Sequence, residues 1–433
     1  MMTSASSTVA RGPQSGPLMR EFDHVDPQIG PDGTPYDYYR RVRDEALAAG
    51  RMVGWAERHG GFWAVFGYEE FMELARQPEF FSNKEPTFPP YPVKEPFMIV
   101  SYDDPDHRLQ RGLVNRPFNP VGVKVYEAQI RENVNLLIDG FIEDGQADLA
   151  KIIAKPIPAL VTAIIMGLPA EEGPRFARWV AALAEAHTMT VEQSEANIDE
   201  MYAYFDQTIA RYQADPGGDV LSHVVNSEFE GRKFTHDELR GYCTLLMVGG
   251  IDNTARLLSA ILWHLGRDTQ LRDRLRQDPA LIPAAVDEFL RYYSPACVGR
   301  MIARDVTFHG CEMKAGDLMQ CVIPIANRDP RKFENPDEFR LDRKLNQHLA
   351  LGNGTHRCLG ANLITLEARV LLEEFLQRMP DYEVDSGKDI HWIPGPIAGI
   401  SSVPVHFKPG KPLNRHGGAQ RKAVEAWLAS AHA

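Results

Sequence analysis

The sequence predicts a mainly α fold (α+β), in which one helix-rich domain carries small antiparallel sheets. Helical patterns dominate the chain from Asp106 onward. Strand-like stretches are short, and they lie near residues 52–66, 299–323 and 382–407. Helices and strands do not alternate regularly, which argues against a parallel doubly wound sheet.

Composition indicates a soluble globular enzyme. The 433 residues are 44% hydrophobic and 24% charged, and the net charge of −12 gives no bulk support for binding nucleic acid. The five cysteines contain no C-x-x-C pair, which fits a reducing cytoplasm. The first 20 residues show neither a secretion signal nor a membrane-spanning stretch. We therefore expect a cytoplasmic protein that binds neither nucleic acid nor a membrane.

The elements follow in order along the chain. Residues 1–20 are rich in Ser, Gly and Pro and are expected to be a disordered tail, whereas residues 21–409 form the predicted domain. A helix from Tyr36 to Ala49 precedes a small hairpin sheet over residues 52–66, and a Pro-rich loop follows over residues 82–101. Further helices are predicted over 121–143, 150–167, 171–188, 192–213, 218–227 and 235–266. In the tail of residues 410–433, residues 420–431 are expected to form a short, loosely attached helix.

The helix predicted over 235–266 is apolar on nearly all faces, so it belongs in a core. Its centre carries Gly249 and Gly250, and each glycine costs about 1 kcal/mol relative to alanine. Asp252 and Asn253 follow, and both are costly to bury without partners. A function explains this loss of stability, because the two glycines would open a groove for a small ligand such as O₂. The alternative is a helix bend stabilised by bonds from side chains to the backbone.

A second segment surrounds one cysteine with glycines. Cys358 follows Gly352 and Gly354 and precedes Gly360, after which a helix is predicted from Ala361 to Arg378. Glycines let a backbone approach a large planar ligand closely, and N–H groups of a tight loop can point at the sulfur. This arrangement suits a thiolate that must reach a flat, buried iron. The alternative is a buried structural cysteine in a glycine-rich turn.

These two segments resemble motifs of the cytochrome P450 family, of the soluble bacterial type and its camphor and cineole monooxygenase branch. The resemblance covers about residues 30–409, and it implies the helix-rich single domain of that family, with small sheets around a buried haem. Two positions depart from the family pattern. Leu351 stands where the family normally has Phe, and Asn253 stands where it normally has Thr, followed here by Thr254.

The resemblance implies roles for further residues. Cys358 would ligate the iron of haem b (iron protoporphyrin IX), within a loop that includes Gly352 and Gly360. Asp252, Asn253 and Thr254 would organise water and protons for oxygen activation. Glu288, Arg291 and Arg343 match a buried structural cluster behind the cysteine loop. The residues expected to bind the haem carboxylates are His107, Arg111, Arg300 and His356.

The resemblance also locates a substrate pocket that is mostly apolar and compact. Such a lining favours a small hydrophobic organic substrate, for example a monoterpenoid or an aromatic compound, held largely by shape. The expected lining residues are Phe88, Tyr91, Phe97, Met98, Leu245, Val248, Gly249, Ala296, Val298 and Ile397.

The function implied is a haem-thiolate monooxygenase that uses O₂ to hydroxylate or O-dealkylate its substrate. No flavin or nicotinamide domain is expected, since no G-x-G-x-x-G follows a strand. Electrons would then come from a separate ferredoxin-type or flavodoxin-type donor with its reductase. The basic residues expected to dock an acidic ferredoxin are Arg108, Arg111, Arg116, Lys124, Lys344 and Arg357. Two alternatives stay open, namely a peroxide-driven haem-thiolate enzyme and a haem-binding sensor without turnover.

Overall fold

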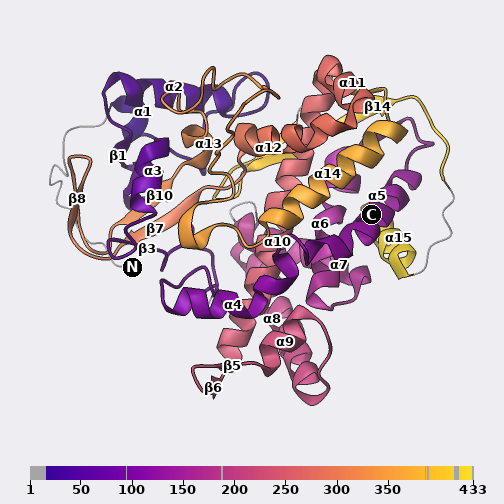
Figure 1. The fold of residues 1–433 in the computed structure, drawn as a ribbon, viewed down its shortest axis with the longest axis horizontal. Coiled ribbons are helices and arrows are strands. Elements are labelled where there is room, and N and C mark those ends of the chain that lie inside the picture. Colours follow the sequence, from indigo (N-terminus) through magenta and orange to yellow (C-terminus); the bar gives the residue numbers. More distant parts are fainter. Residues whose placement is uncertain are drawn as a thin grey trace.

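The computed structural model describes residues 16–93, 95–186, 189–385, 387, 390–413 and 419–431. The molecule has a helical part and a smaller part built around a sheet, with α1 and α2 beside the sheet (Figure 1). The long helix α10 (His236–Arg267) passes through the helical part. The prediction of a helix-rich fold with small sheets is confirmed.

The predicted helices occur in the expected order with shifted ends, and α1, α3, α11 and α13 were not predicted. Residues 123–139, expected as part of one helix, divide into a 3-10 turn and α5, while a π-helical turn (Ala150–Ala154) precedes α6. The α-helices are α1 (Pro17–Arg20), α2 (Tyr36–Ala48), α3 (Tyr68–Leu74), α4 (Asp106–Phe118), α5 (Glu127–Asp139), α6 (Pro156–Met166), α7 (Gly173–Ala184), α8 (Val191–Ala214), α9 (Val220–Asn226), α11 (Thr269–Gln277), α12 (Ile282–Tyr293), α13 (Ile323–Ala326), α14 (Ala361–Arg378) and α15 (Ala419–Ala431).

The largest sheet has the strand order β1-β2-β10-β7-β3. Its pairs are antiparallel, as expected, except that β10 runs parallel to β2. A long connection separates these two strands in sequence, so no hairpin fixes their relative direction. The strands are β1 (Val53–Ala56), β2 (Phe62–Val65), β3 (Phe81–Ser82), β4 (Gln146–Asp148), β5 (Glu228–Phe229), β6 (Arg232–Lys233), β7 (Val298–Ile302), β8 (Val306–Phe308), β9 (Cys311–Met313), β10 (Leu318–Cys321), β11 (Tyr382–Val384), β12 (His391–Ile393), β13 (Gly399–Ser402) and β14 (Pro404–Phe407).

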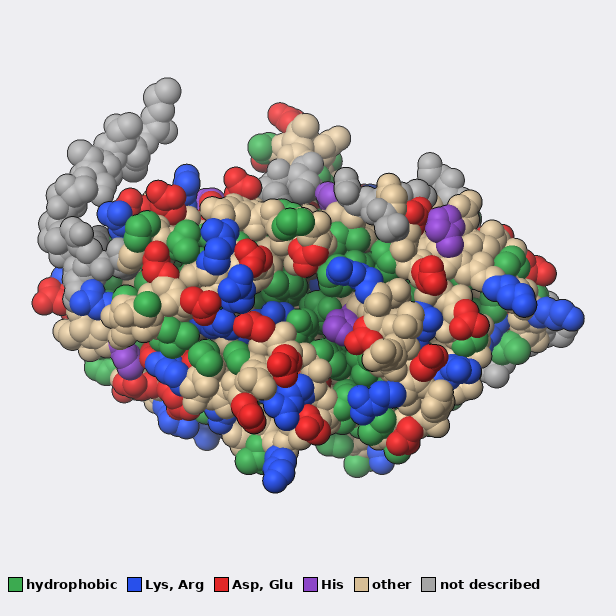
Figure 2. All heavy atoms as spheres, turned by 90° about the horizontal axis from the view of Figure 1, so that it is seen from above, with side chains coloured by type: hydrophobic (Ala, Val, Ile, Leu, Met, Phe, Trp, Pro, Cys, Tyr) green, Lys and Arg blue, Asp and Glu red, His purple; other side chains and the backbone are tan. Residues whose placement is uncertain are grey.

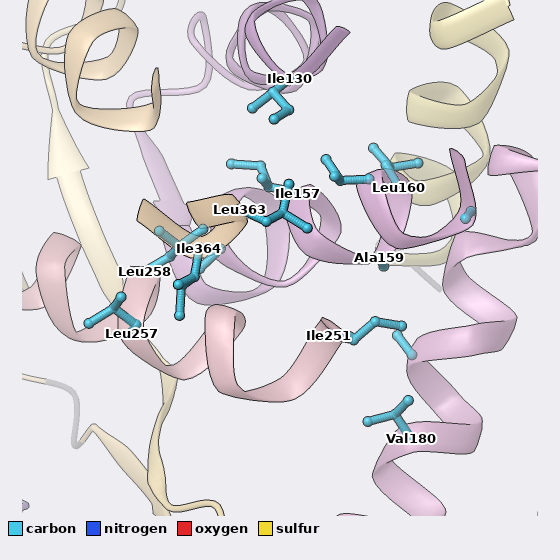
Figure 3. Packing of buried hydrophobic residues seen from close by; sticks show 14 of the residues in the cluster. Ile130, Ile157, Ala159, Leu160, Val180, Ile251, Leu257, Leu258, Leu363 and Ile364 are labelled. Carbon is cyan, nitrogen blue, oxygen red and sulfur yellow. The ribbon is translucent and has the colours of Figure 1, made fainter. Parts of the chain in front are cut away.

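The main core forms where α10 meets the surrounding helices. Figure 3 shows apolar side chains from α5, α6, α7, α10 and α14 packed against one another, with Ile251 of α10 among them. Thr235 and Glu238 form a capping box that fixes where α10 begins. By length and apolar composition α10 could cross a membrane, yet 78% of its apolar stretch of 18 residues is buried inside the fold. It is therefore the core helix of this domain.

A buried ion-pair cluster fixes the loop that precedes the cysteine. The Glu288 carboxylate receives bonds from Arg291 at 2.7 and 2.8 Å and from Arg343 at 3.0 and 3.2 Å. The Arg291 guanidinium also donates to the carbonyls of Asn327, Pro336 and Glu338. The predicted structural role of Glu288, Arg291 and Arg343 is confirmed, because all three join α12 to residues 327–343.

Both chain ends differ from expectation in the part of the chain that is described. Residues 1–15 lie outside it, whereas α1 forms within the expected tail and buries Met19, so residues 17–20 are part of the fold. The predicted C-terminal helix exists as α15, but its expected loose attachment is wrong. Trp427 is buried, and its indole N–H donates to the Lys151 carbonyl at 3.1 Å. Burial of a large aromatic side chain makes α15 part of the core.

Candidate functional site

Cys358 lies in a tight loop that ends on helix α14. The Cys358 backbone N–H donates to the Leu351 carbonyl at 2.7 Å, which closes the loop. Gly352 and Gly354 both have φ of +69°, a left-handed conformation that disfavours any other residue. Gly360 is the residue before α14, so the predicted exit into a helix from Ala361 to Arg378 is confirmed.

The Cys358 side chain is exposed in the structure but lies among crowded protein atoms. Its side chain is accessible to water, yet crowding by protein atoms is the largest influence on its pKa, which it raises. The Gly360 backbone N–H and the charges of Arg111 and Arg357 lower the pKa of the Cys358 thiol. Accessibility combined with desolvation is typical of a side chain that lines an interior space. A positively charged ligand such as a metal ion would therefore stabilise the thiolate there.

Four basic side chains gather beside this loop. The rings of His107 and His356 lie 3.9 Å apart, and Arg111 donates to the Thr355 carbonyl at 3.4 Å. Burial lowers the pKa of His356 to about 3, with further lowering by His107, Arg300 and Arg111. Burial also lowers the pKa of Arg300, which lies on β7 and is 6% exposed. The structure thus brings together the four residues expected to bind carboxylates.

This cluster fits an anionic ligand next to the thiol. Within the described residues, Arg111, Arg300 and His356 form no ion pair, and the buried His107 Nε2 has no hydrogen-bond partner. The buried guanidinium of Arg300 needs an anionic acceptor, which a haem carboxylate would supply, and Arg111 and the two imidazoles could donate further bonds to such a group. The donor set therefore suits the cofactor that the resemblance implies.

The two glycines at the centre of α10 have different surroundings. A Cβ at Gly249 would meet no atom within 4 Å, so the helix presents open space there. A Cβ at Gly250 would lie 2.5 Å from Thr162 Oγ1 of α6, so this glycine permits close packing of two helices. The expectation that both glycines open a groove is thus wrong for Gly250. The helix is continuous through both positions.

This difference predicts opposite effects of two alanine substitutions. Gly249→Ala should raise the free energy of unfolding by about 1 kcal/mol through helix propensity. Gly250→Ala gains the same propensity but forces α6 and α10 apart, a strain of about 1–3 kcal/mol. Urea unfolding of the two variants in parallel measures the difference. Equal stability of the two variants would contradict the packing role of Gly250.

Asp252, Asn253 and Thr254 follow on the same helix. Asp252 is buried, and burial raises the pKa of its carboxyl although Arg256 lies close. Asp252 Oδ2 and Asn253 Oδ1 are buried without a hydrogen-bond partner among the described side chains. Thr254 is buried as well. One carboxyl oxygen of Asp252 and the amide oxygen of Asn253 are therefore available to water or to a bound ligand.

Most of the residues expected to line the substrate pocket lie in or next to α10, β7 and the Pro-rich loop, whereas one of them, Phe88, lies elsewhere. Tyr91 and Phe97 pack edge to face at 5.7 Å, and the charges of Asp252 and Arg256 act on the Tyr91 hydroxyl. Ala296 and Ile397 form a β-bridge, as expected for neighbours. Leu245, Val248 and Val298 are buried or half-buried on α10 and β7, and Met98 is buried.

Phe88 does not join this group. Its ring packs 4.5 Å from the Phe62 ring and 5.9 Å from the His24 ring, inside the core cluster next to the sheet. Its expected place in the pocket is therefore wrong, because the Pro-rich loop turns this aromatic side chain towards β2.

Figure 2 shows a hollow on one face of the molecule, with hydrophobic side chains at its bottom and charged side chains around it.

Two polar residues of the site were not expected from the sequence. Arg256 lies one turn after Asp252, so its position in an otherwise apolar stretch was a usable signal. Glu185, at the end of α7, contacts Arg256 but has no local pattern that distinguishes it from a surface acid. Long-range pairs of this kind become visible only in three dimensions.

Comparisons with known proteins agree on one family. A protein-family model described as "Cytochrome P450" matches residues 198–406. The chain is 35% identical to a steroid C26-monooxygenase of Mycobacterium tuberculosis, over 82% of this chain and 96% of that protein. It is 33% identical to a steroid C26-monooxygenase of Mycolicibacterium smegmatis, over 91% of this chain and 98% of that protein. The solved structure of CYP109E1 from Bacillus megaterium in complex with testosterone has a TM-score of 0.77 and 29% identity, covering 86% of this chain and 98% of that chain.

Proposed function

The chain belongs to the cytochrome P450 family, and from this premise we propose that it hydroxylates or O-dealkylates a hydrophobic organic substrate with O₂. The observation that carries the proposal is the meeting of Cys358 with four basic side chains, three of which have no ion pair among the described residues. One thiol ligand and several carboxylate-binding groups suit haem b. A cytoplasmic location fits the free cysteines and is part of the proposal.

The residues would hold the cofactor from two sides. Cys358 Sγ would ligate the iron, and the guanidinium and imidazole groups of Arg111, Arg300, His107 and His356 would bind the two carboxylates. The haem, when bound, supplies the oxygen-activating chemistry. The Gly360 N–H and the charges of Arg111 and Arg357 would stabilise the thiolate.

The polar residues of α10 would manage water and protons. Burial raises the pKa of the Asp252 carboxyl, which favours its protonated form, and Oδ2 has no hydrogen-bond partner among the described residues. Asn253 can accept through Oδ1 and donate through its amide, but it has no hydroxyl proton to pass on. The open space at Gly249 would let a diatomic ligand lie against the helix. Asp252 is therefore the proton donor in this proposal, and Asn253 orients the water next to it.

Two substrate classes are candidates for the apolar pocket. The lining around Tyr91, Phe97 and Ile397 favours a compact hydrophobic molecule such as a monoterpenoid or a methoxy-aromatic compound. The names of two relatives and the testosterone complex of a third protein favour a steroid. Both classes bind through shape and apolar contact, so the volume of the pocket decides whether the compact molecule or the larger steroid fits.

The test is a titration of the ferric Soret spectrum of the haem-loaded protein with cyclic monoterpenoids, methoxy-aromatics and testosterone. A shift towards high spin with one set identifies the class that reaches the haem. Substrate-dependent product formation with a ferredoxin and its reductase then supports the monooxygenase. Equal rates with peroxide alone would favour the peroxide-driven alternative. Binding without consumption of reduced nicotinamide nucleotide, given competent partners, would favour a sensor.

An exposed surface near the cysteine loop would dock the electron donor. Asn362 of α14 donates to the Phe118 carbonyl at 2.9 Å, which brings the end of α4 next to the residues that follow Cys358. Exposed cations and exposed apolar side chains lie on α4, on the residues that follow it, and on the chain before Cys358; they are Arg108, Arg116, Lys124, Lys344, Arg357, Leu109, Val121, Val125 and Leu345. A basic surface with apolar contacts suits an acidic ferredoxin.

Reversing one charge on this surface should weaken docking without affecting the haem. We expect Arg116→Glu to raise the KM for an acidic ferredoxin several-fold at low salt, with the difference shrinking as ionic strength rises. Steady-state kinetics at varied ferredoxin and salt concentrations measure this effect. Arg40→Glu on α2 is the control, because α2 lies beside the sheet (Figure 1). An equal change in both variants would refute the assignment of the docking surface.

A further inference from the structure

One acid contacts an imidazole of the basic cluster beside the cysteine loop. Asp104 Oδ1 lies 3.3 Å from His107 Nδ1, and the Asp104 side chain is 39% exposed whereas the imidazole is 2% exposed. Because a carboxylate only accepts hydrogen bonds, this contact places a proton on Nδ1. The other ring nitrogen, Nε2, is buried without a hydrogen-bond partner among the described residues.

The charge of the His107 ring decides what Nε2 can do. A neutral imidazole with its proton on Nδ1 presents a lone pair at Nε2, which repels a carboxylate oxygen. An imidazolium donates from both nitrogens and would bind a haem carboxylate. His107 therefore suits the role proposed above only in its charged form, and the negative charge of Asp104 favours that form.

Burial opposes the charged form of His107. Burial is the largest influence on its pKa and lowers it, as does the charge of Arg111, whereas Asp104 and Asp103 raise it. The ring of His356 lies 3.9 Å away and stays neutral, because burial lowers its pKa to about 3. Any positive charge on this pair of rings therefore belongs to His107, where an acid faces it.

Two further charged groups complete the surroundings. Asp103 precedes Asp104, but its carboxylate already accepts bonds from Ser82 Oγ at 2.5 Å and from the Asn83 backbone N–H at 3.0 Å. Arg300, on β7, adds a positive charge that acts on the neighbouring imidazole. Asp104 is therefore the acid that contacts the buried ring.

We propose that Asp104 is a positioning residue that keeps His107 charged and lets its Nε2–H bind a haem carboxylate. The inference rests on the proposed function, since it concerns how the chain holds that cofactor. Water reaches the exposed side of Asp104 and supplies the proton. Because only the charged ring binds a carboxylate, the haem-bound protein takes up this proton at a higher pH than the haem-free protein. Haem retention should therefore weaken as the pH rises through the titration of His107 in the haem-bound protein.

The experiment measures the rate of haem transfer from the haem-loaded protein to an excess of apomyoglobin across neutral pH. Asp104→Asn keeps the shape and an acceptor oxygen for Nδ1–H but removes the charge, so the rise in transfer rate should have its midpoint about one pH unit lower. Asp104→Glu keeps the charge and should return the midpoint most of the way to the value of the unchanged protein. An unchanged midpoint in Asp104→Asn would overturn the inference.

A second substitution ties the effect to the imidazole. His107→Gln removes the titrating group, so haem transfer should become faster and nearly independent of pH over the same range. Asp104→Asn added to His107→Gln should then change nothing further. A further change in the double variant would show that Asp104 acts through another group. The resonance Raman bands of the haem carboxylates should follow the same midpoint as haem transfer, which a general loss of stability would not produce.

Asp106→Asn is the matched control. Asp106 is an acid in the first turn of α4, whereas the bond to the ring comes from Asp104. Its substitution should leave the midpoint in place, and an equal shift in both variants would refute a specific role of Asp104. A protein that shows the expected shifts but forms no product would refute the proposed function alone. One that forms product with an unchanged midpoint in Asp104→Asn would refute the inference alone.

Discussion

Replacing Cys358 by serine is expected to abolish substrate oxidation and the thiolate spectrum together. The serine hydroxyl keeps a similar size and the bond from the Cys358 backbone N–H to the Leu351 carbonyl, so the loop should fold. A hydroxyl is a weak ligand, whereas the thiolate sulfur donates electron density to the iron and favours oxygen activation. Product formation should fall to background, and the carbon monoxide difference spectrum should lose its thiolate-type band.

A second cysteine provides the control for this substitution. Cys311 is buried in the sheet region, where its thiol contacts the Val53 carbonyl at 3.7 Å. Cys311→Ser should leave the spectrum and product formation intact, with at most a modest loss of stability. A thiolate-type band that survives in Cys358→Ser would rule out Cys358 as the iron ligand.

Glu288→Gln is expected to cause the largest loss of stability of any single substitution considered. The Glu288 side chain is 1% exposed and compensates Arg291, whose own side chain is 0% exposed. Removing one partner of a buried pair leaves an uncompensated charge and costs about 3–5 kcal/mol. Proteins of this kind have a total stability of roughly 5–15 kcal/mol, so the variant should express poorly and retain little haem.

An exposed pair with the same geometry makes the comparison quantitative. Arg40 and Asp37 have the same spacing of three residues on a helix and a distance of 2.6 Å, against 2.7 Å for Arg291 and Glu288. Asp37→Asn should hardly change the urea midpoint, since solvent screens that pair. Similar losses in the two variants would show that spacing, rather than burial, sets the contribution of Glu288.

Local patterns predicted the helices well. Helix α14 has its predicted ends, because Gly360 and the long apolar stretch that follows define a start and a face within one short segment. The start of α10 follows from its capping box at Thr235. The sheet order was not predictable, since β2 and β10 are far apart in sequence and nothing local to either strand specifies a parallel partner.

The candidate site was predictable where a motif carries its own spacing. His107 and Arg111, Arg300, and His356 were expected from three separate segments, and the structure brings them together. The loop residues were less predictable, since an aromatic side chain in a Pro-rich loop can turn to either side. Phe88 turns towards Phe62, while Tyr91 lies near Asp252.

The pairing of α7 with α10 had no local signal at all. Glu185 follows an amphipathic helix, where acids are usually solvated, and only the folded chain places it on Arg256. Gly250 was misread for the same reason, because its close neighbour Thr162 belongs to another helix.

The docked helix α15 matters for anyone who wishes to fuse a reductase to this chain. A Cβ at Gly173, at the start of α7, would lie only 3.6 Å from the Trp427 ring, so α15 is packed directly on that helix. A fusion joined after residue 409 would delete α15 and leave an apolar surface on α5 and α7 open to water. The joint should therefore follow residue 431, and the linker must start from the side of the molecule where α15 lies beside α5 (Figure 1).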